Sequence, residues 1–189
     1  PGINIRTPFT AIIGTDEFDQ FMETNRLWEV VSREKDFTAL QKQFLARTIS
    51  DELEHKLSVF IRLNTKPLAV RSSSLFEDSL SQPFSGIFGT YLLPNNHPDP
   101  EVRLIQLIGA IKLVFSSIYS DNSRIYFEAV NYKVEQEKMA VVIQAVVGHR
   151  YGEIFYPHIS GTAQSFNFYP VANMTPHDGF AVAAVGLGQ

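Results

Sequence analysis

The stretch Pro67-Leu68-Ala69-Val70-Arg71-Ser72-Ser73-Ser74 places a short apolar run directly before an arginine and three hydroxyl-bearing residues. The apolar run follows a turn signal, which is typical of a buried strand. The residues from there to Tyr91 are rich in Ser, Gly and Pro, and therefore predict a loop. The sequence thus predicts a strand that delivers Arg71 to the start of a hydroxyl-rich loop.

This composition suits the binding of an anion such as a phosphate. An arginine keeps its charge at all ordinary pH values and offers a planar fork of donors that fits phosphate oxygens. Serine hydroxyls and glycine N–H groups can converge on the same anion, and glycines let the main chain approach it closely. The GxxxxGK[ST] phosphate loop is absent from the sequence. On composition alone an ordinary surface loop is the favoured interpretation. The order and spacing of the motifs in the wider stretch must therefore decide between a surface loop and an anion-binding loop.

Length and composition are those of a globular protein. The chain has 189 residues, of which 44% are hydrophobic and 19% charged, so it is long enough to bury a core. One domain fits this length. Two small sub-lobes, residues 1–66 and 67–189, are the alternative. The first and last residues predict that the chain is part of a longer protein.

The charge balance and the absence of cysteine exclude several classes of function. With 16 basic and 20 acidic residues the net charge is -4, which makes nucleic acid an unsuitable partner. The lack of cysteine excludes disulfides, thiolate catalysis and Cys-ligated metals, and is compatible with a cytoplasmic protein. No apolar run approaches the roughly 20 residues that cross a bilayer, so no membrane partner is expected.

Hydrophobic periodicity predicts strands and helices that are interleaved unevenly, which indicates an α+β fold. A helix is expected after Thr15 or Asp16, and residues 38–63 form one helix or two. Residues 139–147 form a nearly continuous apolar run that contains β-branched residues, which predicts a central strand buried on both faces. Further strands are predicted at residues 9–13, 67–70, 89–93, 160–169 and 180–185, and further helices at residues 101–119 and 123–132.

Four short motifs follow one another in a fixed order: Val70-Arg71-Ser72-Ser73, Glu77-Asp78, Phe84-Ser85-Gly86 and Thr90-Tyr91-Leu92. This order resembles the amino-terminal nucleotide-binding domain of the phosphoenolpyruvate synthase and pyruvate phosphate dikinase family. Weaker similarities extend the resemblance to nearly the whole chain. They lie in residues 12–18, in residues 139–144, in the Ser160-Gly161-Thr162-Ala163 segment, which resembles a turn of the family, and in residues 185–189.

The resemblance implies a partial ATP-grasp type domain, a mixed sheet with flanking helices that binds ATP and Mg²⁺. In this family ATP phosphorylates a histidine on a separate domain, and the phosphoryl group then passes to an acceptor such as pyruvate in a third domain. By the matching positions, Arg71 would be the catalytic phosphate-binding residue, with Ser72 beside it. Ser85, Gly86 and Thr90 would lie in the loop over the phosphates, and Gln144 would lie near the adenine. No metal ligand is assigned.

Two departures from the family pattern support an alternative. Gly89 stands where the family often has an acidic residue, and Gln189 replaces the usual Glu. The alternative is a non-catalytic regulatory or docking module that keeps the fold, and the sequence beyond Gln189 would discriminate between the two. In either case, this part of the protein alone is not expected to catalyse a complete turnover.

Other polar residues are assigned mainly structural roles. The five histidines lack metal-ligand spacing and are expected at the surface. For Glu77-Asp78 an ion pair or a helix cap is favoured over Mg²⁺ binding. Gln144 needs a hydrogen-bond partner, which is either a backbone group or an adenine. We expect core positions for three aromatic residues, Phe166, Phe168 and Tyr169. Two basic residues, Arg124 and Lys133, are candidate ligand contacts.

Overall fold

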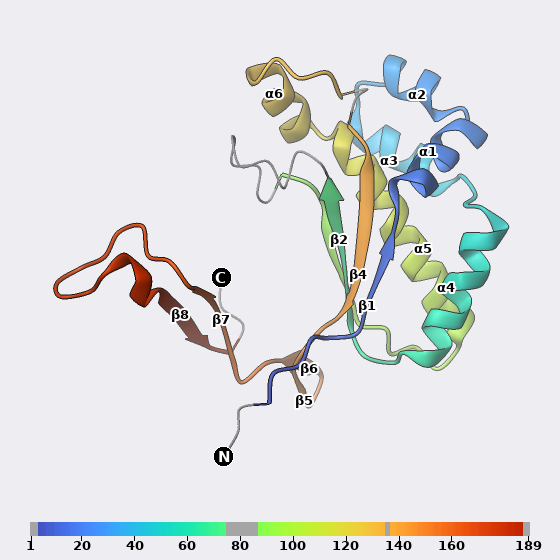
Figure 1. Cartoon of the computed structure of the whole chain (residues 1–189). Helices are drawn as coiled ribbons and strands as arrows, with labels where there is room; N and C mark the ends of the chain where they lie inside the picture. The colour runs from blue at the N-terminus through green and yellow to red at the C-terminus, as the bar shows by residue number, and fades with distance from the viewer. Residues whose placement is uncertain (1–3, 75–86, 135–136, 187–189) are drawn as a thin grey trace. The chain divides into compact units, whose positions relative to one another are not determined.

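The computed structural model of the chain describes residues 4–74, 87–134 and 137–186 (Figure 1). It divides the chain into two compact units, Pro1–Val146 and Val147–Gln189. The sequence left one domain, or two sub-lobes of residues 1–66 and 67–189, as alternatives, and the two units do not coincide with these sub-lobes. Residues on both sides of position 66 contribute to one hydrophobic core, because helix α4 (Asp51–Leu63) packs against helix α5 (Pro100–Ser116).

Unit 1 contains a four-stranded sheet in the order β1-β4-β2-β3, and every neighbouring pair is antiparallel. The prediction of a central strand at residues 139–147 is confirmed, since β4 lies between β1 and β2. The strands are β1 (Thr10–Ile13), β2 (Leu68–Ser74), β3 (Thr90–Leu93) and β4 (Met139–Ala145).

Among the described residues of unit 1, helices pack against one face of this sheet. Along β4, Met139, Val141 and Ile143 are buried, whereas the residues between them are half-buried. The prediction that β4 is buried on both faces is therefore wrong. In Figure 1 helices α1, α4 and α5 lie to one side of the sheet, α6 lies beyond the upper ends of the strands, and α5 contacts β2, β3 and β4. We call the opposite side of the sheet the open face.

The core lies between α5, the other helices and the sheet. Phe115 of α5 packs against Phe18 and Phe21, with ring centroids 5.2 and 5.5 Å apart. Phe44 joins this cluster at 5.8 Å from Phe21. The helical elements are α1 (Thr15–Thr24), α2 (Leu27–Arg33), α3 (Phe37–Leu45), α4, α5, the 3₁₀ turn η1 (Ser117–Tyr119) and α6 (Asp121–Ala129).

The segment from Pro100 to Ala129 is apolar enough to cross a membrane by length and composition, but 67% of its most apolar window is buried inside the protein. It therefore has the character of a core helix of a globular unit.

Residues 38–63 form two helices rather than one, which answers a question that the sequence left open. Ser50 is the N-cap of α4, because its side-chain oxygen accepts a hydrogen bond from the Leu53 backbone N–H at 3.2 Å. Such a cap satisfies one of the unpaired N–H groups of the first turn. At the end of α3, the buried Lys112 Nζ donates to the carbonyl oxygens of Leu45, at 3.2 Å, and Arg47.

Unit 2 consists of two small antiparallel ribbons. The first pairs β5 (His149–Tyr151) with β6 (Ile154–Tyr156), and the second pairs β7 (Ile159–Gln164) with β8 (Phe180–Val185). A 3₁₀ turn, η3 (Pro176–Asp178), precedes β8. Residues 160–163 therefore lie in a strand, as the predicted strand at residues 160–169 implies for its first part, and not in the turn that the family resemblance suggested. A Cβ atom at Gly161 would lie 2.1 Å from the Val182 carbonyl oxygen, so this close strand pair requires glycine.

The aromatic residues of unit 2 do not form a core. Phe166, Phe168 and Tyr169 are 38%, 71% and 88% exposed, so the prediction that they are core residues is wrong. Among the described residues of unit 2, no hydrophobic side chain is buried. A two-stranded ribbon is too narrow to bury such rings without another layer against it.

The Ser50 cap can be tested by measuring the free energy of unfolding in urea. We expect Ser50→Ala to lower it by about 1 kcal/mol, because the first turn of α4 loses its side-chain acceptor. Ser58→Ala is the control in the same helix, since the Ser58 hydroxyl donates to the His55 carbonyl oxygen within the helix and caps nothing. Equal effects of the two substitutions would contradict the capping role.

Candidate functional site

The strand register places Arg71 on the open face of the sheet. Arg71 lies directly opposite Thr90 of β3 and Val142 of β4, and Val142 lies opposite Ile12 of β1. Residues directly opposite each other in an antiparallel pair point to the same face. A row of four side chains, Ile12, Val142, Arg71 and Thr90, therefore crosses the open face over all four strands.

A second row on the same face contains Gln144. Gln144 lies opposite Thr10 of β1 and Ala69 of β2, and Ala69 lies opposite Leu92 of β3. Gln144 is two residues beyond Val142, so it is a diagonal neighbour of Arg71, with Cα atoms about 7–8 Å apart by sheet geometry. The guanidinium, the Thr90 hydroxyl and the Gln144 amide thus share one surface.

Gln144 has a side-chain partner. Its Nε2 donates to Thr10 Oγ1 at 3.2 Å, and Thr10 Oγ1 in turn donates to the Pro8 carbonyl oxygen at 3.0 Å. The partner is thus neither of the two alternatives that the sequence suggested, a backbone group or an adenine. This bond uses one of the two amide hydrogens, which leaves the other and the carbonyl oxygen of Gln144 for a ligand.

Arg71 is exposed, and its charge is not neutralised inside the described structure. None of the ion pairs formed between described residues includes it. An internal ion pair would have occupied the donors that an anion needs. No described acidic side chain therefore competes with a ligand for the guanidinium on the open face.

The other predicted residues lie elsewhere. Ser72 is opposite Val141, so its side chain lies on the helix-covered face, away from Arg71. Strand β2 continues to Ser74, and its alternation separates neighbouring residues. Ser85 and Gly86 lie outside the described residues, as do Glu77-Asp78. Of the six predicted residues, the described structure brings together Arg71, Thr90 and Gln144.

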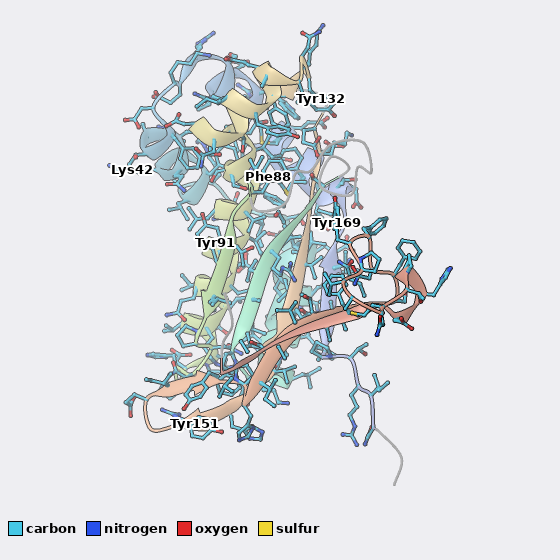
Figure 2. All side chains as sticks on the ribbon, turned by 90° about the vertical axis from the view of Figure 1, so that its left-hand side faces the viewer. Lys42, Phe88, Tyr91, Tyr132, Tyr151 and Tyr169 are labelled. Atoms are coloured by element: carbon cyan, nitrogen blue, oxygen red, sulfur yellow. The ribbon has the colours of Figure 1, made fainter. Side chains whose placement is uncertain are left out.

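Gly89 has a packing reason to be glycine. A Cβ atom at this position would lie 2.8 Å from Tyr91 Cε2 and 3.4 Å from Ser117 Cβ. Tyr91 is labelled on β3 in Figure 2, and burial raises the pKa of its phenol. An acidic residue at position 89 would have to displace this ring. Gly89, which departs from the family pattern, therefore leaves room for the Tyr91 ring.

Sequence reasoning missed the apolar part of the open face. Ile12 is 72% exposed and Leu92 is 66% exposed, although both lie in strands. They share the two rows with the polar residues, so the face combines apolar surface with a few polar groups, as ligand sites commonly do. The period-2 alternation of β1 and β3 could have revealed these residues, but both strands have only four residues, which is a weak signal.

The histidines do not assemble a metal site within the described residues, where no group of three or more His, Asp or Glu side chains could hold an ion. The rings of His149 and His158 lie 4.7 Å apart in unit 2, and the Tyr151 hydroxyl is hydrogen-bonded to His158 Nε2 at 2.5 Å. His55 is exposed on α4.

Comparison with known proteins bears on this arrangement. The family model described as "Pyruvate phosphate dikinase, AMP/ATP-binding domain" matches residues 1–189. The chain belongs to this family. The resemblance that the Arg71 motifs indicated is thereby confirmed, and ATP is the cofactor that membership of the family supports.

One relative carries a related description. The chain is 29% identical over 143 residues to an uncharacterized phosphotransferase, YvkC, of Bacillus subtilis (strain 168). The match covers 74% of this chain and 16% of the relative. The chain therefore corresponds to a small part of that longer protein.

If the open face is a binding surface, its polar residues should contribute little to folding. We expect Arg71→Ala and Gln144→Ala each to change the free energy of unfolding by less than about 1 kcal/mol. Ile143→Ala, on the buried face of the same strand as Gln144, should cost about 2–5 kcal/mol. The measurement is urea denaturation of the three variants. A loss of several kcal/mol for Arg71→Ala would assign that residue a structural role instead.

Proposed function

We propose that the open face of the unit 1 sheet binds the ATP of a phosphotransferase, as part of an ATP-grasp type domain. One observation carries the proposal: the register aligns Arg71 with Thr90 and places Gln144 on the same face. The chain's membership of an AMP/ATP-binding domain family supports ATP as the ligand.

Each of the three residues has a role that its chemistry supports. The Arg71 guanidinium would bind phosphate oxygens and offset the charge that develops during phosphoryl transfer, which depends mainly on positioning and charge stabilisation. The Thr90 hydroxyl would donate a further hydrogen bond to the same phosphates. Gln144 would bind the adenine edge, with the exposed apolar surface of Ile12 on the neighbouring strand β1 under the base.

Mg²⁺ belongs to the proposal only as the ion that accompanies ATP. Within the described residues no cluster of three or more carboxylate or histidine side chains could hold it, and we assign it no protein ligand. The transfer of the phosphoryl group to a histidine on another domain, and from there to an acceptor such as pyruvate, is proposed for the whole protein, because the chain spans 16% of the relative that it matches.

The nucleotide role of Arg71 can be tested by calorimetric titration with ATP, with and without Mg²⁺. We expect Arg71→Ala to weaken binding at least about tenfold, because charge-assisted hydrogen bonds to phosphate are lost. Arg62→Ala is the matched control, since Arg62 is exposed on α4 and pairs with Glu101 on the helical side of unit 1. Unchanged affinity in Arg71→Ala would reject the assigned role.

The adenine role of Gln144 predicts an effect on base selectivity. We expect Gln144→Leu to weaken ATP binding and to reduce the preference for ATP over GTP, because an amide reads donor and acceptor positions that differ between the two bases. Competition titrations of the two nucleotides measure this preference. A preference that stays the same while both affinities fall together would show that Gln144 supports the strand and does not read the base.

A further inference from the structure

A hollow in unit 1 is lined by residues other than those of the open face. It has a volume of about 470 Å³ and is formed mainly by α2, α6 and the segments that follow them. No residue of the two open-face rows lines it. We call it the α2–α6 pocket; the residues that the argument uses are Trp28, Lys35, Arg124, Phe127, Glu128 and Lys133.

The pocket is positively charged in a chain whose net charge is negative. Lys35, Arg124 and Lys133 line it, together with one acidic residue, Glu128. The ion pairs between described residues include none of these three cations. Three cations against one carboxylate, with concave walls around them, favour an anionic occupant. The two residues that the sequence marked as ligand contacts, Arg124 and Lys133, thus lie together here and not at the proposed nucleotide site.

Arg124 is held in a fixed orientation at this site. Its Nη1 donates to the Lys35 carbonyl oxygen at 2.9 Å, and its Nη2 donates to the Glu34 carbonyl oxygen at 3.2 Å. These two bonds use two of the five N–H donors of the guanidinium. The remaining donors belong to a group that has already lost its rotational freedom, so binding an anion costs less conformational entropy.

The walls are aromatic. Phe127 is buried, and Trp28 is half-buried with its ring edge-on to Phe18 at 6.1 Å. Tyr132, labelled in Figure 2, lies 5.5 Å from the Phe127 ring. Burial raises the pKa of Tyr132, and the charge on Glu137 raises it further, so this phenol adds no negative charge near neutral pH. Aromatic walls favour a flat, apolar ligand body.

Together these features define the class of ligand. A volume of about 470 Å³ falls within the range of pockets that hold small organic molecules. Flat aromatic walls and a cationic lining suit a planar ring that carries an anionic group. We propose that the α2–α6 pocket is a second binding site, separate from the nucleotide site, for a small planar aromatic anion whose charged group binds to Arg124, Lys35 and Lys133.

The test uses Trp28, the single tryptophan of the chain. Incorporation of 5-fluorotryptophan gives one ¹⁹F signal, which reports on the pocket directly. The probe is 2-naphthoate, and the neutral 2-naphthamide has nearly the same shape without the charge. We expect 2-naphthoate to shift the Trp28 signal in a saturable manner, with an affinity at least about tenfold higher than that of 2-naphthamide.

The charge requirement is tested by a paired substitution. The double variant Lys35→Glu, Lys133→Glu should bind 2-naphthoate at least about tenfold more weakly. The control is Lys42→Glu with Lys66→Glu, which makes the same change of charge at two exposed lysines outside the pocket. Arg71→Ala should leave 2-naphthoate binding unchanged, and saturating ATP with Mg²⁺ should not displace the probe.

Three results would overturn the proposal. The first is the lack of a saturable shift with 2-naphthoate, and the second is equal affinity for the acid and the amide. The third is that ATP displaces 2-naphthoate and that Arg71→Ala abolishes 2-naphthoate binding. This result would place the probe at the nucleotide site. Failure of Arg71→Ala to affect ATP binding would reject only the proposed nucleotide site, so the two proposals fail independently.

Discussion

The pairing of β2 with β4 is the constraint on which the rest of the structure depends. In the observed register Leu68 and Val70 are buried against the helices, and Arg71 points to the open face. A slip of one residue would reverse every side chain of β2. It would place a guanidinium without a partner in the core and expose two large apolar residues, at a cost of several kcal/mol. The same apolar residues that fold the sheet therefore fix the direction in which its arginine points.

The described helices of unit 1 pack against one face of the sheet, and we assign the function to the other face. Their packing around Phe115 and against β2, β3 and β4 accounts for the core of unit 1. The opposite face has exposed apolar side chains beside a cation, a hydroxyl and an amide, a combination that folding alone does not require. We propose this face as the nucleotide-binding surface, and the chain's membership of an AMP/ATP-binding domain family supports a nucleotide as the ligand.

The sequence was sufficient for features that depend on local patterns. The apolar run of β4 predicted a central strand, and the motifs around Arg71 identified the family. Features that depend on pairing could not be predicted. The side on which Ser72 lies follows from the extension of β2 to Ser74, and the exposure of Phe168 follows from the lack of a covering layer in unit 2. The division after Val146 likewise results from contacts between segments distant in sequence.

The most direct test of the nucleotide-binding face is an amide NMR titration of the isotope-labelled chain with ATP and Mg²⁺. The account predicts that the largest shifts occur at Arg71, Thr90 and Gln144, while buried helix residues such as Leu40 and Leu57 stay nearly unchanged. Shifts confined to the residues around Trp28 and Arg124, with the three strand residues unmoved, would contradict it.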